Sequence, residues 1–263
     1  MAETENYTIS QRRAEIQRLF RRNDSLSIAQ LAEKLGVSEM TVRRDLDWLE
    51  RKGQVRRTHG GAVATERMAF EFDFVARRQA NRAAKQAIAR RAVRLISPGD
   101  KLILDTGTTT LELAHLLKGF TDLTVITPSL AVASELQYSP GVQTVLLGGV
   151  IRKGSPDLTG LVTETVLDMF MADIAFQGAD GIGADGALYT ADMHMAKVDQ
   201  KIRTRARRTY VLADSTKLAR PALTRHGFIQ QVDALITDEN LLPRQRKHLR
   251  RLGAEVIVAP MKA

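Results

Sequence analysis

The sequence contains no cysteine and no long apolar run. Without cysteine the chain forms no disulfide, no thiolate zinc site and no cysteine nucleophile. Its apolar runs all fall short of the roughly 18 residues that a membrane-spanning helix needs, and its first ten residues lack the basic-then-apolar pattern of a secretion signal. We therefore expect a soluble cytoplasmic protein that does not contact a membrane.

Positive charge, by contrast, is abundant. The 263 residues include 39 Lys and Arg against 30 Asp and Glu, which gives a formal net charge of +9. Such an excess favours acidic partners, of which nucleic acid is the commonest, although charge alone fits an inert basic surface equally well. The length suits two domains, or one large α/β domain with a small appendage.

The first 64 residues predict three short helices followed by a hairpin. Apolar residues at helical spacing predict helices over 10–22, 28–35 and 39–52, and residues 54–63 predict two short strands around a Gly-Gly turn. Only a short turn that contains Gly36 separates the second helix from the third, as a helix-turn-helix requires. With the hairpin as its wing, we expect residues 1–64 to form a winged helix-turn-helix that binds a double-stranded DNA operator.

The third of these helices has a buried face and an outward face. Val42, Leu46 and Leu49 share one stripe and face the core, so N-terminal residues of the outward face can reach base edges. An ordinary three-helix subdomain with a charged surface is the alternative interpretation. Residues at helix N-termini and in the basic hairpin suit phosphate or minor-groove contacts. The candidate DNA contacts are Ser27, Ser38, Glu39, Thr41, Arg43, Arg44, Arg56, Arg57 and His59.

Strand and helix patterns alternate from residue 101 onward. Near-continuous apolar runs predict strands over 101–105, 123–127, 142–148, 172–179, 208–214, 232–238 and 255–259. Such runs, with helical patterns between them, predict an α/β domain with a mainly parallel sheet that helices cover on both faces. We expect residues 65–79 to be a linker and residues 80–263 to be an effector-sensing domain, whose first helix turns Ala84, Ile88 and Ala92 inward.

Polar residues follow several of the predicted strands. Asp105 to Thr110 come directly after the first strand and open a helix, where Gly107 permits a tight turn and free amides and hydroxyls can hold a phosphate. The other strand ends meet at the same edge of a parallel sheet, although each could also be an ordinary turn. The candidate effector contacts are Asp105, Thr106, Gly107, Thr108, Thr109, Thr110, Gly148, Gly149, Asp180, Lys197 and Lys217.

Residues 12–63 resemble the N-terminal signature of the DeoR family of bacterial sugar-metabolism regulators, above all in TVRRDLDWLERKG followed by RRTHGGA. The resemblance continues through the second domain in DTGTTT, GADGI and ADSTK. It implies a sensor domain similar to ribose-5-phosphate isomerase and a homodimeric or homotetrameric repressor that a phosphorylated sugar releases from DNA. By the same resemblance Asp105, Gly107, Thr108 and Thr109 would hold the phosphate, while Asp180 and Lys217 would face the sugar.

One segment departs from the family pattern. Many members carry Glu-Ala-x-Val-Lys-Arg after the GADGI loop, whereas here Met195 and Asp199 replace the glutamate and the lysine. The departure indicates a different effector or a non-phosphorylated one, and His194 is a further candidate contact. A sugar-phosphate isomerase that uses Asp105, Asp180 and Lys217 for acid–base chemistry is the second hypothesis, and a ligand-free nucleic-acid-binding scaffold is the third. We expect no catalytic residue, no metal and no cofactor.

Overall fold

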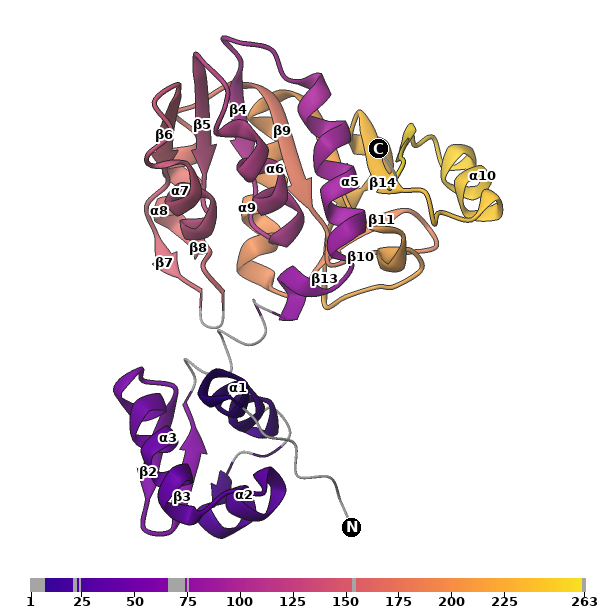
Figure 1. The fold of residues 1–263 in the computed structure, drawn as a ribbon. Helices are drawn as coiled ribbons and strands as arrows, with labels where there is room; N and C mark the ends of the chain where they lie inside the picture. The colour runs from indigo at the N-terminus through magenta and orange to yellow at the C-terminus, as the bar shows by residue number, and fades with distance from the viewer. Residues whose placement is uncertain are drawn as a thin grey trace. The chain divides into compact units, whose positions relative to one another are not determined.

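The computed structural model describes residues 8–20, 23, 25–65, 74, 76–152 and 155–261. The chain forms two compact units, Met1–Arg77 and Arg78–Ala263, and each is described by itself (Figure 1). No helix in the described part of the chain is long and apolar enough to cross a membrane.

The first unit is a winged helix-turn-helix, as the sequence predicts. Its helices are α1 (Ile9–Phe20), α2 (Ile28–Leu35) and α3 (Glu39–Arg51), and its wing strands are β2 (Val55–Thr58) and β3 (Gly61–Ala64). A third strand, β1 (Ser25–Ser27), which the sequence analysis missed, pairs with β3 to give the order β1-β3-β2. Gly61 permits this pairing because a Cβ there would lie 2.1 Å from the Leu26 carbonyl oxygen.

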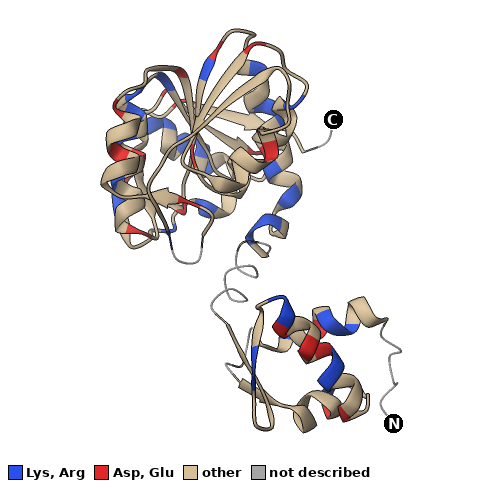
Figure 2. Cartoon of the chain, turned by 90° about the vertical axis from the view of Figure 1, so that its left-hand side faces the viewer, with Lys and Arg blue, Asp and Glu red and all other residues tan. Residues whose placement is uncertain are grey.

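Local capping and a small apolar core fix the three helices. Ser27 forms a capping box with Gln30, and Gly36 ends α2 in the left-handed conformation with φ 64°, which glycine adopts without steric cost. The predicted stripe Val42, Leu46 and Leu49 is fully buried. Cationic and acidic segments lie side by side on the helices of this unit (Figure 2).

A seven-stranded sheet forms the centre of the second unit, in the order β15-β14-β12-β9-β4-β5-β6. Every neighbouring pair is parallel, which confirms the predicted fold class. The strands are β4 (Lys101–Leu104), β5 (Leu123–Thr127), β6 (Val142–Leu146), β9 (Ala172–Gly178), β12 (Ala206–Leu212), β14 (Ala234–Asp238) and β15 (Val256–Ala259). All seven fall within the apolar runs that predicted them or overlap those runs.

Helices cover both faces of this sheet (Figure 1). They are α5 (Arg82–Ala92), α6 (Thr108–Leu117), α7 (Leu130–Leu136), α8 (Leu161–Leu167), α9 (Met193–Thr204) and α10 (Pro243–Arg251), with short 3-10 turns η1 (Val93–Leu95), η2 (Ser215–Lys217) and η3 (Ile229–Gln231). Helices α5 and α6 contact each other, and α8 and α9 form a separate pair. Ala84, Ile88 and Ala92 of α5 are buried, as predicted.

Two small antiparallel elements are added to this framework. Strands β10 (Gly181–Ile182), β11 (Ala187–Thr190) and β13 (Thr224–Phe228) form a three-stranded sheet, and β7 (Val150–Ile151) pairs with β8 (Leu158–Thr159). The sequence predicts neither element, because strands of two to five residues leave little periodic signal.

Candidate DNA-reading face and effector site

The outward face of α3 presents two arginines to solvent. Arg43 and Arg44 are both exposed, and the Arg43 guanidinium lies 3.6 Å from the Glu39 carboxylate. Both members of that pair are about half exposed, so the attraction is worth little and Arg43 can exchange it for a base. Ser38 caps α3 by accepting from the Thr41 amide at 3.3 Å, which leaves other N-terminal amides of the helix for a phosphate.

Arg57 of the wing differs from the other wing candidates because both its side chain and its backbone amide contact α3. Its guanidinium donates to the Asp47 carboxylate, and its backbone amide donates to Glu50 at 2.8 Å. Arg56 and His59 are exposed. The structure therefore places Arg57 where it holds the wing against α3, and leaves Arg56 and His59 accessible to DNA.

A second set of contacts joins α3 to α1. The buried carboxylate of Asp45 accepts from Arg12 at 2.5 Å and from Arg13 at 2.8 Å, both on α1. Arg13 also lies over the Trp48 ring, with 4.4 Å from its Cζ to the ring centroid. Asp45 and Trp48 thus hold α3 against α1.

In the second unit, Asp105 lies at the end of β4, which neighbours the central strand β9, and is 3% exposed. One carboxylate oxygen accepts from the Gly178 amide at 3.0 Å, at the end of the adjacent strand β9. The other oxygen, Oδ1, is buried and has no hydrogen-bond partner in the part of the chain that the structure describes. A buried acceptor without a partner is costly, so this oxygen is poised to accept from a ligand.

Helix α6 begins immediately after Asp105 and has an open N-terminus. Gly107 stands at its N-cap with φ 114°, a conformation that favours glycine, and no side chain caps the first turn. Thr106 and Thr109 are half-buried beside this turn, whereas Thr108 is buried. The hydroxyl of Thr110 is buried and donates to the Gly107 carbonyl at 2.9 Å, so Thr110 supports the turn from within.

Other strand ends bring further candidates to this edge of the sheet. Asp180 follows β9 and accepts from the Ala191 amide at 2.8 Å. Its charge lies close enough to raise the pKa of Asp105 by repulsion, a smaller cause than burial. Lys217 follows β12 on η2, is half-buried, and has no ion-pair partner within the described ranges.

The remaining candidates lie in other surroundings. The Gly148 carbonyl accepts from the Thr163 hydroxyl at 2.6 Å, and a Cβ on Gly149 would lie 2.0 Å from that hydroxyl oxygen. Both glycines therefore pack against α8. Lys197 is exposed on α9, and His194 is exposed in its first turn.

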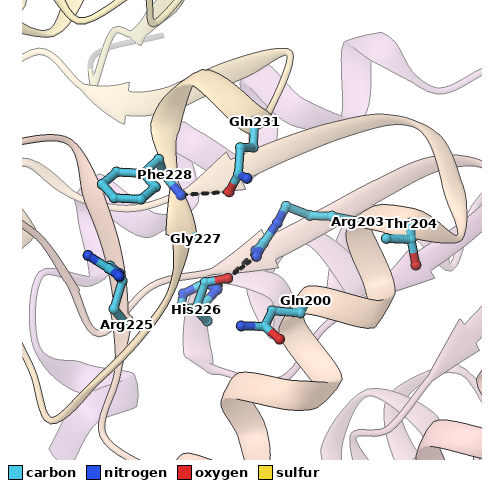
Figure 3. A pocket seen from close by; sticks show the side chains of 8 residues that line it. All are labelled: Gln200, Arg203, Thr204, Arg225, His226, Gly227, Phe228 and Gln231. Atoms are coloured by element: carbon cyan, nitrogen blue, oxygen red, sulfur yellow. Dashed lines mark hydrogen bonds between the residues drawn. The ribbon is translucent and has the colours of Figure 1, made fainter.

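A buried polar cluster, which the sequence analysis did not assemble, continues inward from Asp105. It comprises Gln177 of β9, Asp199 and Arg203 of α9, and His226 of β13. Gln177 donates to the Asp199 carbonyl at 2.8 Å. Arg203 donates to Gln177 at 3.2 Å, to His226 Nδ1 at 2.9 Å and to the His226 carbonyl. Arg203 and His226 also line a pocket of about 500 Å³ with Arg225 and Gly227 (Figure 3).

Burial controls the protonation of this cluster. It raises the pKa of Asp105 to about 7, and it raises the pKa of Asp199 well above the ordinary value, with help from the Asp105 charge. Burial also lowers the pKa of His226 to about 3. Asp199 and His226 lie 3.8 Å apart, and burial disfavours the charged form of both, raising the pKa of the acid and lowering that of the histidine.

Asp199 was noted in the sequence only as a departure from the family pattern. In the structure it replaces a cation with a buried acid beside Asp105. Asp157, which interacts with the same acids, is likewise buried and accepts from Arg152 at 2.6 Å. No signal in the sequence places Asp157, Gln177 and His226 near Asp105, because they come from distant, unrelated segments.

The chain matches two family models. Residues 12–68 match the DeoR-like helix-turn-helix domain, and residues 80–239 match the DeoR C terminal sensor domain. Among similar proteins, the glycerol-3-phosphate regulon repressor of Haemophilus influenzae is 34% identical over 88% of this chain and 89% of that protein. The glycerol-3-phosphate regulon repressor of Escherichia coli K12 is 31% identical over 87% and 90%. The transcriptional repressor AccR of Agrobacterium fabrum is 33% identical over 86% and 88%.

Solved structures are more distant. Ribose 5-phosphate isomerase A of Methanocaldococcus jannaschii is 23% identical, with a TM-score of 0.39, over 53% of this chain and 55% of that chain. Another D-ribose-5-phosphate isomerase, in complex with phospho-erythronic acid, has 20% identity and the same TM-score over 51% and 52%. Scores this low do not bear on chemistry.

Proposed function

Because the chain belongs to the DeoR family of transcriptional regulators, we propose that it is an operator-binding repressor of a sugar-metabolism operon and that a phosphorylated sugar releases it from DNA. The observation that carries the effector half of this proposal is the edge of the sheet at β4. There an open helix N-terminus follows a strand of the parallel sheet, as do a carboxylate oxygen and a lysine that have no hydrogen-bond or ion-pair partner among the described residues.

Each part of this edge suits a different part of a sugar phosphate. The free amides of α6 and the hydroxyls of Thr106 and Thr109 favour a phosphate, because the helix dipole adds to their hydrogen bonds. Lys217 adds a cation for the same group. The Oδ1 atom of Asp105 accepts a sugar hydroxyl, and the raised pKa of Asp105 makes that interaction sensitive to protonation.

On the DNA side, Arg43 and Arg44 are the proposed base readers of the first unit. Each guanidinium can donate two hydrogen bonds to a guanine. Ser38, Glu39 and Thr41 lie at the N-terminal end of α3. Arg56, His59 and the α2 N-terminus at Ser27 reach phosphates. Arg57 positions the wing.

Asn81 offers a route from the effector edge to the linker. It precedes α5, with φ 53°, and its side-chain amide donates to Asp214 Oδ1 at 3.2 Å and to Thr216 Oγ1 at 3.1 Å. Asp214 also caps η2, the turn that carries Lys217. A shift of Lys217 toward a bound phosphate would therefore act on the residue that directly precedes α5. Release then is a population shift between two arrangements.

We propose that the repressor acts as at least a dimer, because an operator with two half-sites needs two recognition helices. Apolar side chains that suit a second copy of the chain are exposed on β7 and α8: Val150, Ile151, Leu161 and Val162. Light scattering should show a smaller particle for the double variant Leu161→Glu with Val162→Glu. The exposed Leu223→Glu is the control and should leave the mass unchanged.

Catalysis by the same edge is the competing function, since Asp105 carries a proton near neutral pH as an acid–base group would. The relatives named above are repressors, which favours regulation. Conversion of ribose 5-phosphate, or of the best-binding sugar phosphate, by the purified chain would support the enzymatic function instead.

The effector proposal is tested by a thermal-shift screen of the full chain with sugar phosphates, each paired with its unphosphorylated parent sugar and with inorganic phosphate. Glycerol 3-phosphate belongs in the panel because two relatives are named for its regulon. A ligand present at about 100 times its Kd stabilises the native state by about 2.7 kcal/mol. We expect such a shift from a phosphorylated compound alone, and loss of it in the double variant Thr108→Ala with Thr109→Ala. An equal shift from the parent sugar would exclude the phosphate site.

A further inference from the structure

Helix α10, at the right in Figure 1, is strongly basic. Five of its nine residues are Lys or Arg and none is acidic. All five cations are exposed, and Leu249 is the buried residue of the helix. Surface helices of soluble proteins commonly mix the two signs of charge, so a helix with cations alone indicates an anionic partner. The five cations are Arg244, Arg246, Lys247, Arg250 and Arg251.

Several of these cations repel one another when nothing is bound. Arg246 and Arg250, like Lys247 and Arg251, are four residues apart, and like charges at that spacing repel by about 0.2–0.5 kcal/mol per pair. The helix dipole disfavours Arg244 and Arg246 near its positive end and favours Arg250 and Arg251 in the last turn. Within the described part of the chain, none of the five has an ion-pair or hydrogen-bond partner that offsets this repulsion.

The cations also form a geometric pattern. Arg244, Lys247 and Arg251 are spaced i, i+3 and i+7, which places them in one stripe on the side of the helix opposite Leu249. At 1.5 Å per residue the stripe is about 10 Å long. Duplex DNA presents one phosphate charge per about 1.7 Å of axis, so the stripe can meet two or three phosphates along a strand.

The distribution of net charge along the chain also favours an anionic partner for the second unit, which contains α10. Residues 78–263 contain 25 Lys and Arg against 18 Asp and Glu, so seven of the nine net positive charges lie in the unit that does not contain the recognition helix. The α10 stripe contains no apolar side chain of the kind that an amphipathic helix needs to enter a membrane surface. A polyanion is therefore the partner that the surface fits best.

We propose that α10 is a second nucleic-acid contact, which binds the phosphate backbone of double-stranded DNA without reading its sequence. The inference rests on the proposed function, since the first unit delivers the chain to DNA and the linker then holds α10 at a high effective concentration near it. Backbone contacts of this kind add affinity and salt dependence but no sequence preference.

The test compares three full-length proteins on a 60-base-pair random duplex and on a duplex selected from a random pool with the wild-type chain. The test variant is Lys247→Gln with Arg251→Gln; glutamine keeps the helix propensity and removes one repulsive pair. The control is Arg207→Gln with Arg208→Gln, which removes the same charge from exposed positions of β12 in the same unit.

In the test variant, we expect the slope of log K against log salt to become shallower by roughly 1.8 on both duplexes, about 0.9 for each lost phosphate contact. At 0.2 M salt this corresponds to a loss of affinity on the order of 10-fold, with sequence preference unchanged. The control variant should keep the wild-type slope, and melting temperatures of all three should agree.

Three results would overturn the inference. If the wild type binds the selected duplex and the test variant has the same slope and affinity, α10 does not touch DNA while the proposed function stands. If the wild type binds neither duplex, the proposed function fails and the inference fails with it. The same proteins are also titrated with poly-glutamate, as a model of an acidic protein. If the test substitutions abolish binding to poly-glutamate but not to either duplex, the partner of α10 is an acidic protein.

Discussion

At the scale of single residues, the most informative group is Asp105. The sequence predicts its place at the end of a strand, but not its burial beside Asp199 and His226, which tertiary packing alone determines. For Met195 and Asp199, too, the sequence shows one part of the information and only the fold shows the rest. The departure from the family pattern is visible in the sequence, whereas its consequence, a second buried acid at the effector edge, is visible only in the fold.

The buried acids and the buried histidine predict opposite effects of pH on stability. The raised pKa of Asp105 means that the native state keeps a proton that the unfolded chain loses above pH 3.8, so this group lowers stability as pH rises toward about 7. The lowered pKa of His226, about 3, means that the unfolded chain alone gains a proton below pH 6.5, so this group raises stability as pH rises from about 3 to 6.5.

We therefore expect Asp105→Asn to remove a decline in the free energy of unfolding between pH 4 and 7, on the order of a few kcal/mol. Urea denaturation followed by circular dichroism measures it, and fluorescence of Trp48, the one tryptophan, reports the first unit separately. Asp122→Asn is the control, because Asp122 is exposed and its φ of 58° also suits asparagine. Superimposable pH profiles for Asp105→Asn and the wild type would disprove the buried proton.

The two arginines Arg43 and Arg57 predict different defects. Arg43→Ala removes a base contact and should weaken specific operator binding by about 1–3 kcal/mol, while binding to random duplex changes little. Arg57→Ala releases the wing from Asp47 and should weaken both kinds of binding. Gel-shift titrations on the two duplexes distinguish them, and an equal loss on random DNA for Arg43→Ala would make Arg43 a phosphate contact.

At the scale of elements, the sequence predicts nearly everything that periodicity and capping can encode. Helix α2 has the predicted bounds because Ser27 and Gly36 mark both of its ends. The helical pattern of residues 163–171 predicts a helix, which in the structure spans Leu161–Leu167, since Gly160, with φ 92°, precedes it and opens it earlier. Strand β1 pairs with β3, which is distant in sequence, while β7 and β10 are only two residues long, so periodicity predicts none of the three.

The junction between α5 and η2 supplies a prediction about coupling. Asn81→Gly keeps the left-handed backbone conformation, because glycine accepts φ 53°, and removes both side-chain hydrogen bonds to the Lys217 turn. We expect this variant to bind operator and effector with wild-type affinity, and to lose at least half of the coupling free energy between them.

Effector titrations of the operator complex measure this coupling. Asn81→Asp, which keeps a side chain of the same size but places a carboxylate beside Asp214, should be defective as well. If the effector releases Asn81→Gly from the operator as readily as it releases the wild type, the signal reaches the first unit by another route.

At the scale of the whole molecule, the chain divides its tasks between two compact units. The small unit holds the proposed recognition helix and carries 14 Lys and Arg against 12 Asp and Glu, whereas the large unit holds the proposed effector edge and most of the net positive charge. This distribution could be counted from the sequence. Its interpretation could not, because the fold shows which cations are paired, such as Arg12 and Arg13 with Asp45, and which are exposed.

The central claim is that one ligand, bound at the Asp105 edge, releases the chain from its operator. The most direct measurement is fluorescence anisotropy of a labelled operator duplex, bound by the full chain and titrated with the sugar phosphate that gives the largest thermal shift. We predict dissociation with a midpoint that follows occupancy of the effector site, and no dissociation for the double variant Thr108→Ala with Thr109→Ala. An operator complex that persists while the wild-type chain is saturated with that ligand would contradict the account.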